Sequence, residues 1–198
     1  MRRLTSFPKR LAAVAAMACA AALAPVAAFA ATSASQHAGA SVPSCATSGL
    51  VVWLNVPAGN HYAGGAFYYL ELTNLSGRAC TLHGSPGVSA VSLGGRRLGS
   101  PAGGDYSGDA PAVILAPGAT ASSKLQIADT GNFGTQCFAT QPAPGNPGIL
   151  PTAAGLRVYP PNQTASKVVP YPLQACAHTG PVYMGVSPVT PSLVPPGI

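Results

Sequence analysis

Glycine and proline interrupt this 198-residue chain so often that few segments are long enough to form a helix. The chain holds 23 Gly and 21 Pro. Turn signals such as Ser85-Pro86-Gly87 and Pro160-Pro161-Asn162 recur along it. After residue 30, no segment keeps a helical period of apolar residues over about ten positions. The predicted elements are therefore short strands joined by turns.

The clearest strands are Leu50–Val56 and Phe67–Thr73, where apolar residues alternate with others. Pro57–Gly65 is the predicted turn between them. The residues expected on the core faces are Leu50, Val52, Leu54 and Val56 in the first strand, and Tyr68, Leu70 and Leu72 in the second.

Further predicted strands are Val88–Leu93, Ala112–Leu115, Ala121–Ile127, Leu156–Tyr159, Ser166–Val169 and Val182–Ser187. About eight short strands with frequent turns predict an all-β fold, an antiparallel sandwich. We expect one such domain at residues 45–189, after a flexible lead-in at 31–44 and before a Pro-rich tail at 190–198.

Residues 1–30 have the layout of a secretory signal peptide. A basic start precedes an apolar run at Leu11–Ala24, and Ala28-Phe29-Ala30 is a typical cleavage site. We therefore expect a protein that is secreted or associated with the cell envelope. Cys19 lies in the apolar run, and the alternative is that it carries a lipid anchor.

Four cysteines follow that segment: Cys45, Cys80, Cys137 and Cys176. An even number in an exported chain predicts disulfides, with three possible pairings. We favour Cys45–Cys80, because these residues flank the predicted hairpin and an antiparallel hairpin brings its ends together. Cys137–Cys176 is then the second pair. The alternative is a four-thiolate zinc site, but structural zinc ligands usually come as closely spaced cysteine pairs, which this chain lacks.

The charge of the chain comes largely from its first residues. The net charge is +6, and four of the ten basic residues precede residue 11. The other six are spread along the sequence: Arg78, Arg96, Arg97, Lys124, Arg157 and Lys167. A nucleic-acid interface needs basic residues gathered on one face, so we expect no nucleic-acid partner. No apolar run after residue 30 approaches the roughly 18 residues of a membrane-spanning helix, so we expect no transmembrane span in the mature chain.

The segment Tyr68–Val88 contains a pattern of strand, turn and cysteine: Leu72-Thr73-Asn74-Leu75-Ser76-Gly77, then Cys80-Thr81-Leu82-His83-Gly84-Ser85-Pro86-Gly87-Val88. It resembles the core motif of an exported actinobacterial family, domain of unknown function 4232. Ala116–Ala121 resembles a second landmark of the family, and the resemblance extends over about Cys45–Val189. It implies an exported, disulfide-bonded, immunoglobulin-like sandwich without an established activity, and it supplies no catalytic residues.

The motif also has a physical interpretation. Asn tolerates left-handed backbone and Gly adopts positive φ at no steric cost, so Asn74 and Gly77 are expected to turn the chain toward Cys80. Trp53 lies only eight residues after Cys45. In antibody domains, the tryptophan packs on a disulfide that joins the two sheets. Immunoglobulin-like therefore means the architecture here, not kinship with antibodies.

Common catalytic motifs are absent from the sequence, including G-x-S-x-G, H-E-x-x-H and the phosphate-binding loops. The acidic residues are Glu71, Asp105, Asp109 and Asp129. Glu71 alternates out of the core, so a solvent-facing position is expected. We expect no cofactor, no metal and no enzymatic activity. Two alternatives are an extracellular hydrolase with a Ser/His/Asp site assembled in space, and a metal carrier that uses His61, His83 and His178.

Three aromatic side chains are expected on the outer face of the first two strands: Trp53, Phe67 and Tyr69. Outward aromatics on neighbouring strands can form a platform for a partner or a glycan. The alternatives are that loops or the tail cover them, or that both faces are partly buried. The sequence thus favours a non-enzymatic binding or interaction module of the cell envelope or extracellular space, whose partner is an envelope polymer, a lipid or a protein.

Overall fold

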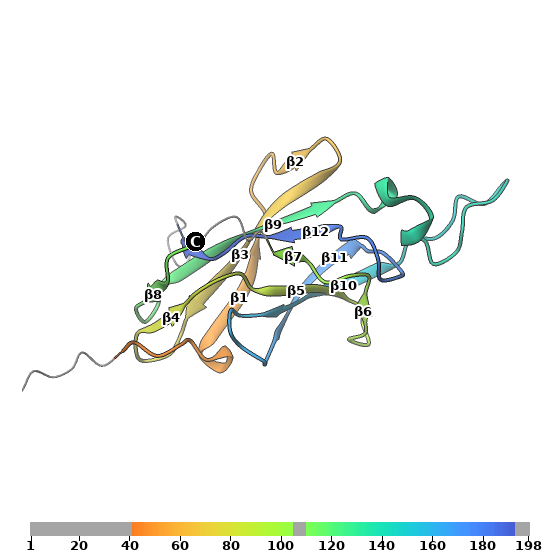
Figure 1. The fold of residues 1–198 in the computed structure, drawn as a ribbon. Coiled ribbons are helices and arrows are strands. Elements are labelled where there is room, and N and C mark those ends of the chain that lie inside the picture. The colour runs from red at the N-terminus through yellow and green to blue at the C-terminus, as the bar shows by residue number, and fades with distance from the viewer. Residues whose placement is uncertain (1–40, 105–109, 193–198) are drawn as a thin grey trace, which may run out of the picture. The chain divides into compact units, whose positions relative to one another are not determined.

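The structure is a computed structural model that describes residues 41–104 and 110–192, and these residues are mostly β (Figure 1). Two short 3-10 helices and thirteen strands occur in this part of the chain. In order they are η1 (Thr47–Gly49), β1 (Leu50–Asn55), β2 (His61–Tyr62), β3 (Gly65–Asn74), β4 (Cys80–Leu82), β5 (Gly87–Val91), β6 (Arg97–Leu98), β7 (Gly103–Gly104), β8 (Val113–Leu115), β9 (Thr120–Ala128), η2 (Thr130–Cys137), β10 (Thr152–Tyr159), β11 (Lys167–Gln174), β12 (Met184–Val186) and β13 (Thr190–Pro191). The expected signal peptide and Cys19 lie outside the described residues.

The larger sheet is built around β3, the longest strand. Its order is β1-β3-β9-β12-β7. In addition, β2 pairs with β3, and β13 pairs with β9. The predicted hairpin is confirmed, because β1 and β3 are antiparallel with Leu54 opposite Leu70. The expectation of a purely antiparallel sheet is wrong, since β7 and β12 are parallel through Gly103 and Gly104. Two glycines carry no side-chain alternation, so the sequence pattern did not indicate this strand.

The smaller sheet has the order β11-β10-β5-β6, and all its pairs are antiparallel. The β10–β11 register shifts between Ala153 and Gly155. A Cβ at Gly155 would collide with the backbone carbonyl of Val169, so only glycine fits this close approach.

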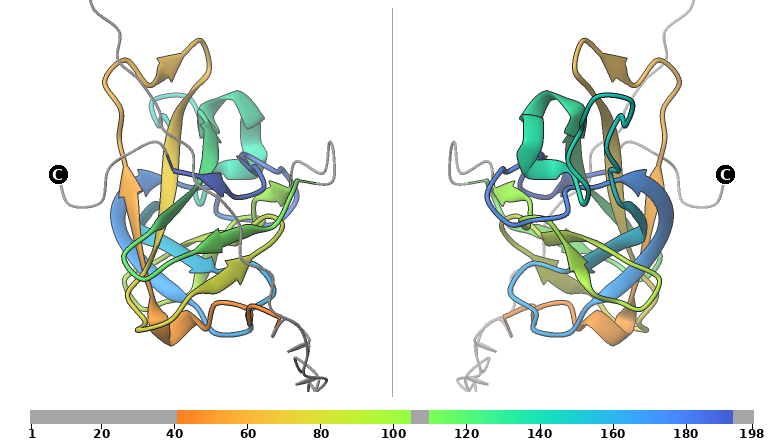
Figure 2. Two further views of the ribbon diagram at one scale, coloured as in Figure 1. Left: turned by 90° about the vertical axis from the view of Figure 1, so that its left-hand side faces the viewer. Right: turned by 90° about the vertical axis from the view of Figure 1, so that its right-hand side faces the viewer.

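A common hydrophobic core lies between the two sheets, which Figure 2 shows from two sides. Tyr68, Leu70 and Leu125 enter it from the larger sheet. Leu156 and Val158 enter it from the smaller sheet and have no exposed surface. Burial of these side chains supplies the main stabilising free energy of such a fold.

A second hydrophobic cluster surrounds the short pair β4–β8 and the cysteine at the start of the domain. Leu50 and Leu72 reach it from the larger sheet, and Leu82 and Leu115 from the two-stranded sheet. Val56 was expected in the core but is 50% exposed, because β1 ends one residue earlier. Among the described residues, no helix is long and apolar enough to cross a membrane.

Candidate functional site

The four described cysteines form the two predicted disulfides, Cys45–Cys80 and Cys137–Cys176. The first closes the hairpin, with its Cα atoms 4.8 Å apart. The backbone beside it is also paired, since Cys45 N–H donates to the Thr81 carbonyl at 3.0 Å. Structural disulfides persist in oxidising compartments, and the two bonds indicate an extracytoplasmic location.

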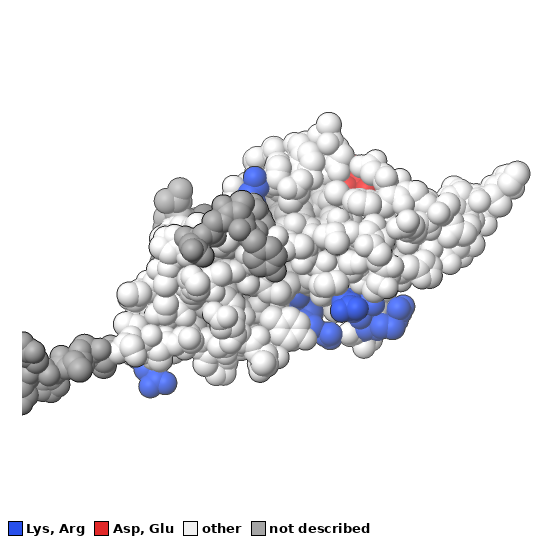
Figure 3. All heavy atoms as spheres, in the orientation of Figure 1, with Lys and Arg blue, Asp and Glu red and all other residues white. Residues whose placement is uncertain are grey.

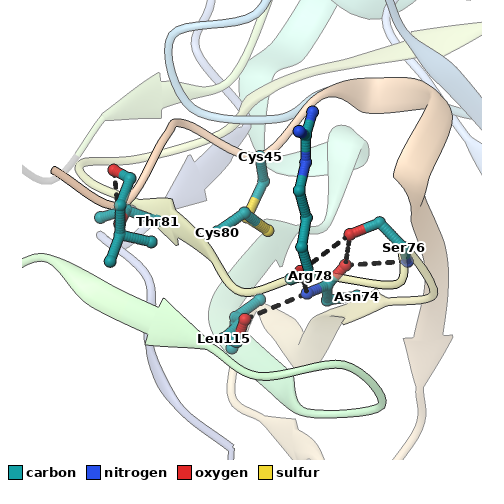
Figure 4. The surroundings of a disulfide bond; sticks show 8 residues. Cys45, Asn74, Ser76, Arg78, Cys80, Thr81 and Leu115 are labelled. Carbon is teal, nitrogen blue, oxygen red and sulfur yellow. Dashed lines mark hydrogen bonds between the residues drawn. A yellow bond between two sulfur atoms is a disulfide. The ribbon is translucent and has the colours of Figure 1, made fainter. Parts of the chain in front are cut away.

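The Asn74 side chain organises the turn beside the first disulfide (Figure 4). Its Nδ2 donates to the carbonyls of Arg78 at 2.9 Å and Leu115 at 3.0 Å. Its Oδ1 accepts from the backbone N–H and the hydroxyl of Ser76, at 2.9 and 2.6 Å. Neither Asn74 nor Gly77 has a positive φ. Among the described residues other than glycine, only Asn162 does. The backbone explanation of the motif is therefore wrong. Asn74 is used for its amide, which satisfies four polar groups at a buried position.

The outer face of the larger sheet carries a groove over β1, β3, β9 and β13. Its lining comprises Asn55, Pro57, Tyr69, Glu71, Ser122 and residues 190–192, and its volume is about 370 Å³. The β3–β9 register places Glu71 opposite Ser122, and the β13 register places Thr190 on the far side of Ser122. We call this feature the Glu71 groove.

Glu71 was expected to face solvent, but it is only 1% exposed. Alternation does place it on the outer face, where it lines the groove among residues from β1, β9 and β13. Ser122 Oγ donates to its Oε1 at 3.1 Å. Its Oε2 is buried without a hydrogen-bond partner in the described part of the chain. Such an atom is costly to leave unpaired, so Glu71 is the most distinctive polar group of this face.

The three expected surface aromatics occupy different environments around the groove. Tyr69 lines it and is 36% exposed. Trp53 is half-buried, and its Nε1 donates to Thr73 Oγ1 at 3.4 Å. Phe67 has Lys124 Nζ 3.8 Å above its ring and the Tyr62 ring at 4.5 Å. The structure therefore brings Tyr69 to the groove, whereas Phe67 is already in contact with the chain's own side chains.

Two tyrosine hydroxyls have a pKa above the usual tyrosine value. Burial first, and the neighbouring Tyr171 hydroxyl second, raise the pKa of Tyr68 to about 12. Burial also raises the pKa of Tyr183 to about 12. The Tyr183 hydroxyl donates to the Leu98 carbonyl at 3.3 Å within the core. Both phenols are therefore neutral hydrogen-bonding groups at physiological pH.

Basic side chains gather below β5 and β6 in the view of Figure 3. Arg157 on β10 donates from Nη2 to the Gly95 carbonyl at 2.8 Å, beside the exposed Arg96 and Arg97. Although the basic residues are spread along the sequence, folding brings these three arginines to one part of the surface, because β5 pairs with both β10 and β6. The absence of a nucleic-acid partner stays a prediction.

The three histidines lie on separate elements and are exposed. His61 is on β2, His83 follows β4, and His178 precedes β12. Among the residues that the structure describes, no group of three or more His, Cys, Asp or Glu side chains is placed to hold a metal ion. No observation of the described chain favours the hydrolase or the metal carrier.

Comparison with curated proteins found no match, and neither did comparison with solved structures. The family model described as a domain of unknown function, DUF4232, matches residues 45–190. These residues include both disulfides and the Asn74 turn. They make up well over half of the sequence, so the chain belongs to the DUF4232 family.

Proposed function

We propose that this protein is a non-enzymatic binding module, and that the Glu71 groove receives a primary ammonium group of its ligand. The observation that carries the proposal is the buried Oε2 of Glu71, which has no hydrogen-bond partner in the described residues. A cation seated in the groove would face a carboxylate that water screens poorly, so the attraction would be stronger than at an open surface.

The cation of the same face does not neutralise Glu71. Lys124 Nζ lies over the Phe67 ring, and Glu71 Oε2 has no hydrogen-bond partner among the described residues. Ser122 occupies only Oε1. One carboxylate oxygen of the groove therefore has no partner among the described residues.

The apolar residues of the groove favour an ammonium group carried by an aliphatic chain. Pro57, Pro191 and the Tyr69 ring offer apolar surface beside the carboxylate. A lysine side chain has the matching chemistry, because its methylenes pack on apolar surface while its ammonium binds an acid. The groove volume of about 370 Å³ lies in the range of small ligand sites. Peptides with free side-chain amines, free or as part of an envelope polymer, fit this description.

The proposal includes an immunoglobulin-like sandwich that works in the extracellular space or cell envelope. Two sheets around a shared core support that architecture, although the parallel β7–β12 pair departs from a purely antiparallel arrangement. The predicted signal peptide and the two disulfides support the location.

The test uses the fluorescence of Trp53, the only tryptophan in the sequence and the cross-strand partner of Glu71. The protein is titrated with N-acetyl-lysine amide and, as the matched control, with the same compound acetylated on its side-chain amine. We expect saturable binding of the first compound, with a Kd of about 1 mM or below. The acetylated compound should not bind, because it lacks the charge.

Two variants assign the binding to the groove. Glu71→Gln keeps the shape of the side chain and should weaken binding at least about tenfold. Glu71→Asp keeps the charge and should retain part of the affinity. If both compounds bind equally, or Glu71→Gln binds as the wild type does, the groove is not an ammonium site and the proposal is wrong.

A further inference from the structure

A second cavity lies on the inner side of β3, between the larger sheet and β11. Its volume is about 230 Å³, and Tyr68, Thr130 and Tyr171 line it. Ile127 and Leu173 add apolar surface, and the exposed His61 and Asp129 also line it. We call it the tyrosine cavity. It shares no lining residue with the Glu71 groove, so a ligand of this cavity is independent of the proposed function.

The two tyrosines form a hydroxyl pair inside this cavity. Their rings meet edge to face with centroids 5.2 Å apart. The Tyr68 and Tyr171 hydroxyls are hydrogen-bonded to each other at 3.1 Å. Each hydroxyl offers one donor and two acceptor positions, so the pair keeps an unused O–H donor and several lone pairs. Because the pKa of Tyr68 is about 12, its hydroxyl stays protonated in the physiological range.

Thr130 provides the independent sign of a binding site. The residue is 2% exposed and lines the cavity at the start of η2. Its Oγ1 is buried with no hydrogen-bond partner in the described residues. Buried hydroxyls in proteins are nearly always paired, so Thr130 Oγ1 indicates a partner that the described residues do not supply.

From these contacts we infer that the tyrosine cavity binds a single sugar ring or a polyol of similar size. Its hydroxyl groups both donate and accept, as the unpaired groups require, and a ring also presents C–H surface to aromatic and apolar side chains. The cavity is slightly smaller than the roughly 300–1,000 Å³ of sites for drug-sized ligands, which limits the ligand to about one ring.

Saturation-transfer NMR on the full mature protein tests this inference. The probes are glucose, galactose, mannose and arabinose, each as the free sugar and as its methyl glycoside. We expect transfer to at least one ring, with a Kd of about 1 mM or weaker. Binding of the methyl glycoside identifies the end unit of a glycan as the ligand, and binding of the free sugar alone identifies a soluble sugar. Either result supports the inference.

Two variants locate the sugar. Thr130→Val removes the unpaired hydroxyl and should lower affinity about tenfold without loss of thermal stability, because no internal bond is broken. Tyr171→Phe should lower affinity by a similar factor. Tyr159→Phe on β10 is the matched control, because it removes a phenolic hydroxyl that lies outside the cavity lining.

Three results would overturn the inference. The first is no transfer to any probe. The second is transfer that Thr130→Val and Tyr171→Phe leave unchanged, since the sugar would then bind elsewhere. The third is a marked loss of stability in Thr130→Val without any sugar binding, which is the behaviour of a cavity whose polar groups are satisfied by ordered water.

Discussion

Glu71 and Trp53 are direct partners across the β1–β3 ladder, and the acidic residue is the more buried of the two. Exposed sheet faces normally show the reverse order, because a carboxylate is hydrated more favourably than an indole. The groove produces this inversion, since residues from β1, β9 and β13 lie beside Glu71. Burying the Glu71 carboxylate lowers the stability of the fold, and the fluorescence of the neighbouring Trp53 reports on its surroundings.

The first prediction concerns the stability cost of this carboxylate. Glu71→Gln should raise the free energy of unfolding by about 1 kcal/mol, because a neutral amide is cheaper to bury than an unpaired carboxylate oxygen. Urea unfolding followed by Trp53 fluorescence measures the change. A variant that is less stable than the wild type would show that Oε2 already has a stabilising partner.

The second prediction concerns the Asn74 turn. Asn74→Ala removes four hydrogen bonds and leaves the Leu115 carbonyl without its side-chain donor. The free energy of unfolding should fall by about 2–4 kcal/mol. Ser76→Ala is the control, because it removes only the hydroxyl bonds and should cost about 1 kcal/mol. Equal losses in both variants would mean that the Asn74 amide does not organise the turn.

The third prediction concerns the first disulfide. Cys45 and Cys80 are 35 residues apart, and a loop of that length corresponds to about 4 kcal/mol in the chain-entropy model. The double variant Cys45→Ser/Cys80→Ser should lose about that much, as measured by urea unfolding in oxidising buffer. Because the second disulfide remains, the variant still has one covalent constraint. A loss below about 1 kcal/mol would mean that the hydrogen bonds beside the bridge hold the hairpin closed without it.

The fourth prediction concerns stability in alkali. The tyrosine pKa in an unfolded chain is about 10, whereas the pKa values of Tyr68 and Tyr183 are about 12. Between these values the unfolded chain releases both protons while the folded chain keeps them. The free energy of unfolding therefore falls as pH rises from 10 to 12, by up to about 1.4 kcal/mol per pH unit for each group. It should not change through these groups below pH 10.

Tyrosinate absorbance near 295 nm checks this assignment directly. In the folded protein, two tyrosines should titrate late, and Tyr183→Phe should remove one late component and make the stability curve less steep. If all tyrosines titrate together near pH 10 in the folded state, the two phenols are not buried as the structure places them.

Local sequence patterns predicted the parts of the fold that depend on neighbours along the chain. Alternation located β1 and β3, and the hairpin geometry identified the partner of Cys45. Two-residue strands such as β7 and β13 have no detectable period, so they depend on the contacts made after folding. The parallel β7–β12 pair could not be predicted from the sequence for the same reason.

The site was predicted less well than the fold, since burial depends on segments that are distant in sequence. Alternation correctly assigned Glu71 to the outer face, but its cover comes in part from residues 190–192. The Tyr68–Tyr171 pair joins residues 103 positions apart. Asn74 was the exception, because Asn followed by Ser and Gly indicates a turn locally. The structure was needed to show that Asn74 stabilises the turn through its side-chain amide and not through a left-handed backbone.

The adjacent residues Tyr68 and Tyr69 line different sites, the first on the inner face of β3 and the second on the outer face. An insertion or deletion of a single residue within Gly65–Asn74 would exchange the two faces and damage both sites at once. Family members that keep these sites should therefore differ in β3 only by substitution. Length variation should be confined to the connections, and an alignment gap inside this strand would mark a relative that lacks the groove and the cavity.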